Sequence, residues 1–98
     1  MKKEVLPLSS STLSVLKTLG AMIKAARLER GMSQVELSRR LGVSRYTVIA
    51  LEKGEPKVSV GTVFEAATIV GIPLLAEDQR TLHKLATTVA NLASVLPE

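Results

Sequence analysis

Apolar residues recur at helical spacing in two short segments on either side of Gly42. In the second segment Val48 and Leu51 lie three residues apart, so they share one face of a helix. The first segment supplies the residues that can meet this face, namely Leu37, Leu41 and Val43. The opposite face of the second helix carries Arg45, Tyr46, Ile49, Ala50 and Lys53. The pattern predicts two packed helices, the second with a polar and partly basic face turned to solvent.

Capping residues set the ends of both helices. Ser33 followed by Glu36 forms a capping box, in which the Ser hydroxyl accepts from a first-turn amide and the Glu carboxylate reaches back to the Ser amide. Gly42 can adopt the left-handed conformation that ends the first helix, and Ser44 can cap the second. The link between them is so short that the chain must change direction abruptly, which predicts a helix-turn-helix.

Three further helices are predicted around this pair. The first runs from Ser11 or Thr12 to Arg30, with Gly20 as a candidate bend. Its candidates for burial are Leu16, Leu19, Ile23, Ala26 and Leu28. Another helix follows the candidate cap Ser59 and places on one face Val60, Val63, Phe64, Ala67 and Val70.

The last helix is predicted from about Glu77 to Leu96, with Glu77 and Asp78 in its first turn, where the helix dipole favours negative charge. Its apolar residues recur at alternating intervals of three and four and are Leu82, Leu85, Val89, Leu92 and Leu96. Such a heptad seam favours pairing with a second helix. Two interpretations remain open, a helix that pairs with another copy or a partner and a helix that folds back onto its own domain.

Composition favours an all-α fold. The chain has 98 residues, of which 46% are hydrophobic, and its only aromatic residues are Tyr46 and Phe64, so the core must be aliphatic and rich in alanine. No segment suggests a sheet, although residues 5–8 could form a short extended arm. The predicted division is an arm and helix start at 1–16, a helix-turn-helix domain at 17–76 and an amphipathic helix at 77–98.

Nothing in the sequence directs the chain to a membrane or an oxidising compartment. It has no cysteine, and its first residues lack the apolar run of a signal peptide. The apolar stretch 58–76 is long enough to imitate a membrane span, but Glu65 lies inside it and Gly71 and Pro73 interrupt it. We expect a cytoplasmic protein without a membrane partner.

Basic residues concentrate where the helix-turn-helix is predicted. Nine basic and four acidic side chains lie within residues 17–57, a net charge of +5, whereas two basic and four acidic side chains give residues 58–98 a net charge of −2. A polyanionic partner such as duplex DNA would require this distribution. The second helix of the pair then has the layout of a helix that enters the major groove.

The candidate contacts with DNA fall into two groups. Those for the bases are Arg45, Tyr46, Thr47, Ile49 and Ala50. Among them Arg45 has the fork that can bond guanine O6 and N7 together, while Ile49 and Ala50 could meet thymine methyl groups or be incidentally exposed. Those for the phosphates are Gln34, Ser44, Lys53, Lys57 and Ser59. For each residue the alternative is an ordinary solvated side chain.

Five short motifs resemble the Xre and phage-repressor (Cro/C1-type) family of helix-turn-helix regulators. They are Ser33-Gln34, Glu36-Leu37, Gly42-Val43-Ser44, Thr47-Val48 and Leu51-Glu52-Lys53-Gly54, and the resemblance extends over roughly residues 19–75. It implies a five-helix, lambda-repressor-like domain that binds double-stranded operator DNA as a homodimer, with its third helix in the groove. It also implies a partly buried ion pair between Arg27 and Glu52, structural rather than catalytic.

A narrower likeness concerns residues 58–75 and the alanine-rich last helix, which are similar to HipB-type antitoxins. That resemblance implies a repressor of its own operon that also holds a HipA-like kinase toxin. Two alternatives remain, a free-standing or phage-type Xre regulator and a toxin-neutralising interaction protein whose DNA binding is secondary. An enzyme is not expected, because the single histidine, His83, has no second ligand type nearby and no phosphate loop, zinc motif or activated nucleophile is present. We therefore expect no metal and no cofactor.

Overall fold

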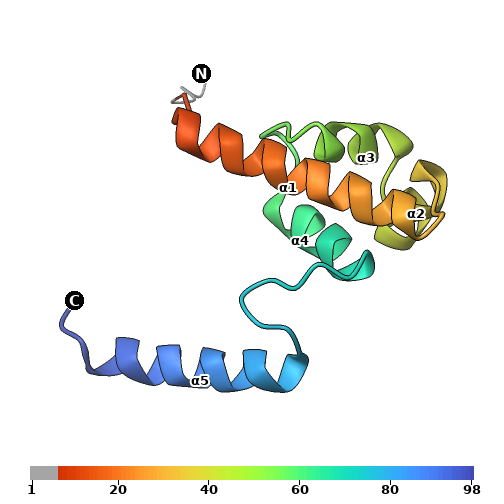
Figure 1. Ribbon diagram of the computed structural model, residues 1–98. Coiled ribbons are helices and arrows are strands. Elements are labelled where there is room, and N and C mark those ends of the chain that lie inside the picture. Colours follow the sequence, from red (N-terminus) through yellow and green to blue (C-terminus); the bar gives the residue numbers. More distant parts are fainter. Residues whose placement is uncertain (1–6) are drawn as a thin grey trace.

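Five helices make up the computed structural model, which describes residues 7–98 and shows no strand within them (Figure 1). Their bounds are α1 Ser10–Glu29, α2 Gln34–Leu41, α3 Arg45–Glu52, α4 Val60–Ile69 and α5 Gln79–Val95. The all-α prediction is confirmed. Half of the extended arm predicted at residues 5–8 lies outside the described residues. Among the described helices, none combines the length and the apolar character required to cross a bilayer.

The predicted caps of the helix pair are present, with one difference. Ser33 Oγ accepts from the Glu36 amide over 3.0 Å, Gly42 has a φ of 70°, and Ser44 Oγ accepts from the Thr47 amide over 3.3 Å. The return bond of the capping box is absent among residues 7–98, because the Glu36 carboxylate lies instead 3.5 Å from Arg40 Nη2 one turn further along α2. The helix therefore begins where the box predicts, with only the serine half of the box in use.

Helices α1 to α4 enclose a small aliphatic core. Its largest fully buried side chains are Ile23, Leu37, Val48, Leu51 and Val70. Three residues predicted on apolar faces are exposed instead: Leu28 at 58%, Val60 at 65% and Phe64 at 48%. Arg27 takes the inward position next to Leu28, one turn after Ile23, and the buried stripe of α4 is centred on Val63, Ala66, Ala67 and Val70, which leaves Val60 and Phe64 at its margin.

A glycine allows α1 to approach the end of α3. Gly20 is buried, and a Cβ built on it would lie 2.6 Å from the carbonyl oxygen of Leu51 and 2.8 Å from that of Glu52. The helix continues through this position to Glu29 (Figure 1). Gly20 therefore serves the close contact of two helices rather than the bend predicted from the sequence.

Gly20→Ala is expected to destabilise the fold by at least about 1 kcal/mol, because a methyl group there overlaps backbone atoms that cannot move independently. Chemical denaturation would measure the change. Gly61→Ala is the matched control, since Gly61 is also helical and a Cβ on it meets nothing within 4 Å. That control should be neutral or stabilising by up to about 1 kcal/mol. Equal stabilities of the two variants would contradict the assigned contact.

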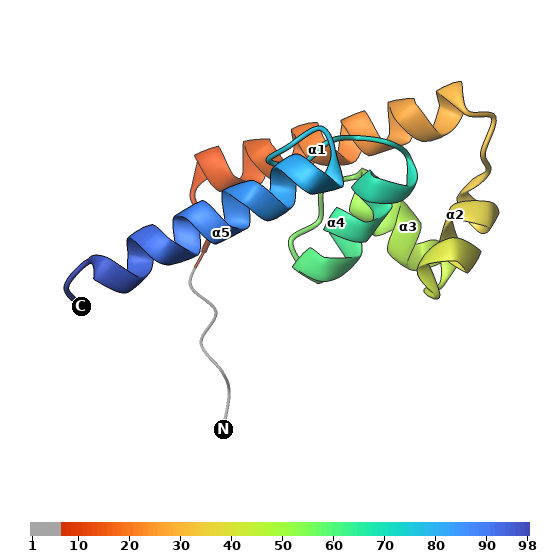
Figure 2. The ribbon, with the colours of Figure 1, turned by 90° about the horizontal axis from the view of Figure 1, so that it is seen from below.

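The last helix lies apart from the other four in Figure 1, and in Figure 2, which is seen from below, it passes in front of α1. No residue of α5 is buried, and its heptad seam is open, with Leu82 exposed at 38%, Val89 at 54% and Leu92 at 57%. The interpretation in which this helix folds back to bury the seam on its own domain is wrong. An open apolar cleft separates α4 from the start of α5, where Phe64 and Leu82 are among the lining residues.

Asp78 caps α5 rather than lying in its first turn. Its Oδ1 accepts from the Thr81 amide over 2.7 Å, and the helix begins at Gln79, two residues after the predicted start at Glu77. The hydrogen bonds from the Thr81 amide and hydroxyl hold the pKa of the Asp78 carboxyl below its ordinary value. The acidic residues thus act at the positive end of the helix dipole, as expected, but from outside the helix.

Candidate nucleic-acid interface

Helix α3 presents its N-terminal half to solvent. Ser44 caps it, Arg45 and Tyr46 are exposed, and Tyr46 reaches 83% exposure, which is unusual for an aromatic side chain in a chain that has only two. Thr47 and Ile49 are half-buried. Because Val48 and Leu51 face the core, α3 is fixed to the domain while this face stays open.

Ala50 is nearly buried, whereas the sequence predicted it on the solvent-exposed face of α3. It is only 6% exposed, and its carbonyl oxygen accepts from the Glu55 amide over 3.0 Å, because the chain after α3 folds back over this turn of the helix. Ala50 nevertheless lines a small hollow beside Tyr46 and Thr47, so its base-contact role stays a prediction. Ile49, which is half-buried, keeps an accessible part of its side chain.

A small hollow joins the two groups of candidate residues. The base group contributes Tyr46, Thr47 and Ala50 to its lining, and the phosphate group contributes Lys57 and Ser59. Sequence analysis missed Thr62, which also lines the hollow from the first turn of α4. Its spacing of three residues from Ser59 was the available signal, since the two hydroxyls lie 2.8 Å apart.

The start of α4 has no side-chain cap. Ser59 occupies the N-cap position, yet its hydroxyl bonds to the Thr62 hydroxyl and makes no bond to an amide of the first turn. Lys57, just before it, is 77% exposed and lies 3.3 Å from Glu55 through Nζ, an exposed pair that contributes little to stability. A helix N-terminus with free amides and an adjacent lysine suits contact with an anion such as phosphate.

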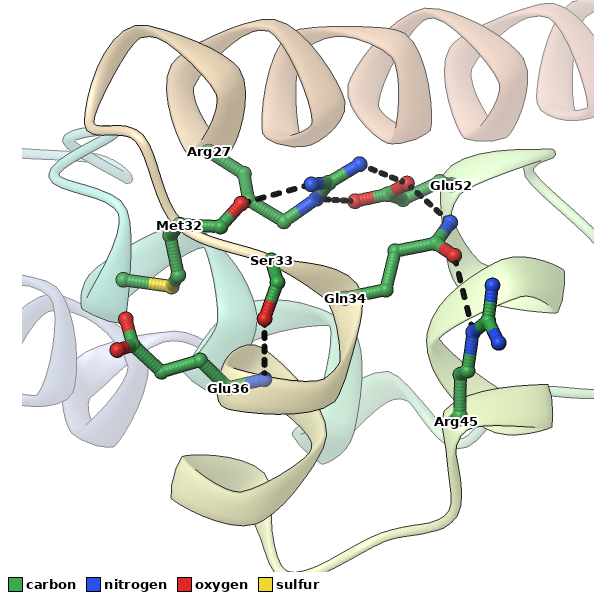
Figure 3. Close-up of polar contacts among 7 residues, drawn as sticks. All are labelled: Arg27, Met32, Ser33, Gln34, Glu36, Arg45 and Glu52. Atoms are coloured by element: carbon green, nitrogen blue, oxygen red, sulfur yellow. Dashed lines mark hydrogen bonds and ion pairs between the residues drawn. The ribbon is translucent and has the colours of Figure 1, made fainter.

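The structure brings Arg27 and Glu52 together beneath this surface (Figure 3). Arg27 Nε donates to Glu52 Oε2 over 2.6 Å and Nη2 donates to Oε1 over 3.1 Å, while Nη1 donates to the Met32 carbonyl oxygen over 2.8 Å. Their side chains are 6% and 3% exposed. The pair thus connects α1, the turn before α2 and the end of α3.

Gln34 and Arg45 are also connected, which sequence analysis did not predict. Gln34, the first residue of α2, donates through Nε2 to Glu52 Oε1 over 3.2 Å, and its Oε1 accepts from Arg45 Nε over 3.4 Å (Figure 3). Both residues were predicted as DNA contacts, one for phosphate and one for a base. In this structure they lie at adjoining helix N-termini and share a hydrogen bond.

The remaining candidates lie at the edges of this surface. Ser44 and Lys53, at the two ends of α3, are exposed. The candidate residues of α5 are remote from the hollow and line none of it. The site is therefore formed by α2, α3 and the beginning of α4, and α2 and α3 lie within residues 17–57, which carry the excess positive charge.

Two capped helices joined by a tight turn, with the outer face of the second one open and basic residues around it, define a DNA-binding domain of the helix-turn-helix class. Residues 23–75 match the helix-turn-helix family, and the chain belongs to that family. The predicted Xre and phage-repressor resemblance is confirmed at this level.

The relatives found by comparison are transcriptional regulators by name. The chain is 36% identical over 52 residues to an uncharacterized HTH-type transcriptional regulator of Methanocaldococcus jannaschii, covering 53% of this chain and 79% of that protein. A similarly named protein of Methanothermobacter thermautotrophicus is 42% identical over 50 residues, which are 51% of this chain and 72% of that protein. The cryptic phage CTXphi transcriptional repressor RstR of Vibrio cholerae is 34% identical over 61 residues, 60% of this chain and 55% of the repressor. None of these three relatives is named as a HipB-type antitoxin.

Proposed function

We propose that this protein is a sequence-specific transcriptional repressor that docks α3 in the major groove of operator DNA. The single observation that carries the proposal is the open N-terminal half of α3, where exposed Arg45 and Tyr46 project beside half-buried Thr47. A helix in the major groove reads bases with such residues of its first turns. Ile49 is the further candidate for an apolar contact with a thymine methyl group. The regulator names of the relatives support the same class.

Phosphate contacts would flank the recognition helix. The residues proposed for them are Gln34, Ser44, Lys53, Lys57 and Ser59, which lie at the N-termini of α2 and α3, at the end of α3 and before α4. Such contacts fix the position of the helix on the duplex and make the affinity dependent on salt. A repressor of this kind acts where the DNA is, so the cytoplasmic location expected from the sequence belongs to the same proposal.

Selection of bound DNA from a random duplex library tests the proposal. A dimeric repressor should recover an inverted repeat whose half-sites are about 34–36 Å apart, one turn of the duplex. Failure to enrich any sequence, together with weak binding at physiological salt, would contradict it. In that case the helix-turn-helix would serve as a protein-binding scaffold.

The dimer would form through α5. Its apolar seam is open along the whole helix, and α5 buries no residue on its own domain. A second copy of the same helix carries a matching seam and would cover it by coiled-coil packing. Dimerisation would also present two copies of α3, as a palindromic operator requires.

Val89→Lys, in the centre of the seam, is expected to convert the dimer to a monomer, because it places a charge in the apolar contact. Thr87→Lys is the matched control, since Thr87 lies on the opposite side of α5. Sedimentation velocity should give a dimeric mass for the wild type and the control and a monomeric mass for Val89→Lys. A monomeric wild type at micromolar concentration would refute the role assigned to the seam.

The finer role we propose is that of a HipB-type antitoxin whose partner is a HipA-like kinase toxin. The observation that favours a protein partner is the open cleft between α4 and α5, where Phe64 is 48% exposed and Leu82 38%. Co-expression with a kinase-like protein from the same operon should give a complex of equal stoichiometry. Purification of the two as separate species would leave a free-standing or phage-type regulator as the better description.

A further inference from the structure

Helix α1 carries an uncharged stripe on its solvent side. Val15 and Met22, which lie two helical turns apart and share one face, are 64% and 47% exposed. The other residues of this face are exposed as well and are Ser11, Thr18 and Ala25. A single exposed apolar residue is ordinary, whereas a continuous uncharged face with large apolar side chains marks a surface for a partner. We call these five residues the α1 stripe.

The α1 stripe lies on the side of α1 that is turned away from α3. Gly20 contacts the carbonyl groups at the end of α3, and Met22, two residues further, is rotated from it by about 160° around the helix. Figure 1 shows α3 above α1, with α4 and then α5 below it. The α1 stripe is therefore on the side of the domain where α5 lies.

The apolar seam of α5 is on the same side of the domain. Its first residue, Leu82, lines the cleft beside α4 together with Phe64, so the seam begins turned toward the domain. Helices α1 and α5 run in opposite directions in both views (Figures 1 and 2). Beyond Lys84 the sequence of α5 contains no charged residue. Two uncharged helical surfaces thus lie on one side of the domain, and neither covers the other, since Val15 is 64% and Val89 54% exposed.

The seam of α5 alone is too small to hold two copies together. It supplies five apolar residues per copy, whereas a stable interface takes about 20–30 residues from each side. The other helices that expose more than one large apolar side chain are α1 and α4, through Val15, Met22, Leu28, Val60 and Phe64. Helices α2 and α3 expose one each, so the surface proposed to read DNA stays separate from this apolar surface.

We propose that α5 of a second copy packs on the α1 stripe, so that α1 and α5 from each copy form a four-helix interface. This inference rests on the proposed dimer and extends it, because the second copy's α5 covers the α1 stripe as well as the seam. Antiparallel neighbours are usual in such bundles, and α1 and α5 already run in opposite directions. Neither surface carries an ion that packing would have to desolvate.

The first test measures the dissociation constant of the dimer by sedimentation equilibrium. Val15→Lys should raise this constant by at least about tenfold, because it removes apolar burial and places a charge in the contact. Met22→Lys should have the same effect, and Val15→Ile should retain the dimer. Ser14→Lys is the matched control, since Ser14 is exposed and lies about 100° around α1 from Val15, outside the stripe. An unaltered constant in both lysine variants of the stripe would overturn the inference.

Circular dichroism should show that these variants keep their helices. Val15 is 64% exposed and is not part of the core, so its replacement should leave each copy folded. Base preference on DNA should also be unchanged in Val15→Lys, because the stripe contains none of the residues proposed to contact DNA.

The second test identifies which copy supplies the helix that covers the stripe. The chain has no cysteine, so a tagged Val15→Cys copy and an untagged Leu85→Cys or Leu92→Cys copy each carry a single thiol. After mixing, a short bismaleimide should join the tagged copy to at least one of the untagged ones, while Ser14→Cys should be joined to neither. If Val15→Cys combined with Leu92→Cys in one chain gives only a link within that chain, α5 folds onto its own α1 and the inference is wrong.

The outcomes separate the inference from the proposed function. If Val89→Lys gives monomers while Val15→Lys leaves the dissociation constant unaltered, the dimer forms through α5 alone, and the inference fails while the proposed dimer stands. If the wild type is a monomer, both fail. If Val15→Lys leaves the dimer intact but prevents binding of a kinase toxin, the α1 stripe binds a different protein and the inference fails.

Discussion

Glu52→Ala is expected to lower the free energy of unfolding by about 3–5 kcal/mol, because it leaves the buried Arg27 charge without its partner. The variant removes both carboxylate oxygens from the Arg27 guanidinium, whose side chain is 6% exposed. One hydrogen bond to the Met32 carbonyl would remain, which cannot balance a buried charge. A domain of this size has little stability to lose, so much of the population could unfold.

Chemical denaturation monitored by circular dichroism would measure this loss. Glu65→Ala is a suitable control, since Glu65 is an exposed glutamate of α4 and its loss should change stability by less than about 0.5 kcal/mol. Replacing both partners, as in Arg27→Met with Glu52→Leu, should recover part of the loss because no charge is left unpaired. A cost below about 1 kcal/mol for Glu52→Ala would mean that Arg27 finds water or another partner, and that the pair does not hold α1 to α3.

The helix ends were predictable because they depend on a few neighbouring residues. Ser33, Gly42 and Ser44 act within one turn of the chain, so their chemistry is readable without knowledge of the fold. The predicted face of Val48 and Leu51 is buried for the same reason, since helical periodicity alone places them together. The sequence thus predicted the ends of α2, the start of α3 and the buried face of α3.

The wrong predictions concern residues whose surroundings depend on segments distant in sequence or on loops. Ala50 is buried because the segment after α3 returns over it, and helical periodicity contains no information about that return. Gly20 is required by the carbonyl groups of Leu51 and Glu52, which lie more than thirty residues away in sequence. A glycine in a helix indicates either a bend or a close approach, and only the packed structure distinguishes the two.

The candidate site was predicted as separate residues, whereas the structure joins several of them. Gln34 and Arg45 were each assigned to DNA from their positions at helix starts, and the hydrogen bond between them depends on how α2 and α3 cross. The connection to Glu52 adds the interior of the domain to this group. Sequence position indicates which residues face outward, but a shared hydrogen bond follows only from the packing of the helices.

Arg45→Ala is expected to reduce discrimination at one base position by about 1–3 kcal/mol, the value of a bidentate arginine–guanine contact. The exposed guanidinium at the start of α3 is the donor that would be lost, and the fold should be unaffected because the side chain is not part of the core. Binding to the selected operator and to duplexes with single substitutions, measured by fluorescence anisotropy, would give the loss at each position.

Lys57→Ala is the control that distinguishes loss of a phosphate contact from loss of a base contact. Lys57 is exposed, lies beside the uncapped start of α4 and is proposed to contact phosphate, so its loss should weaken operator and random duplex alike and reduce the slope of log affinity against log salt by about 1. Loss of a base contact thus changes the preference for one base, whereas loss of a phosphate contact changes the affinity for all duplexes and its dependence on salt. If Arg45→Ala also weakened all duplexes equally and flattened the salt slope, Arg45 would be a second phosphate contact, and sequence choice would have to come from Tyr46, Thr47 and Ile49.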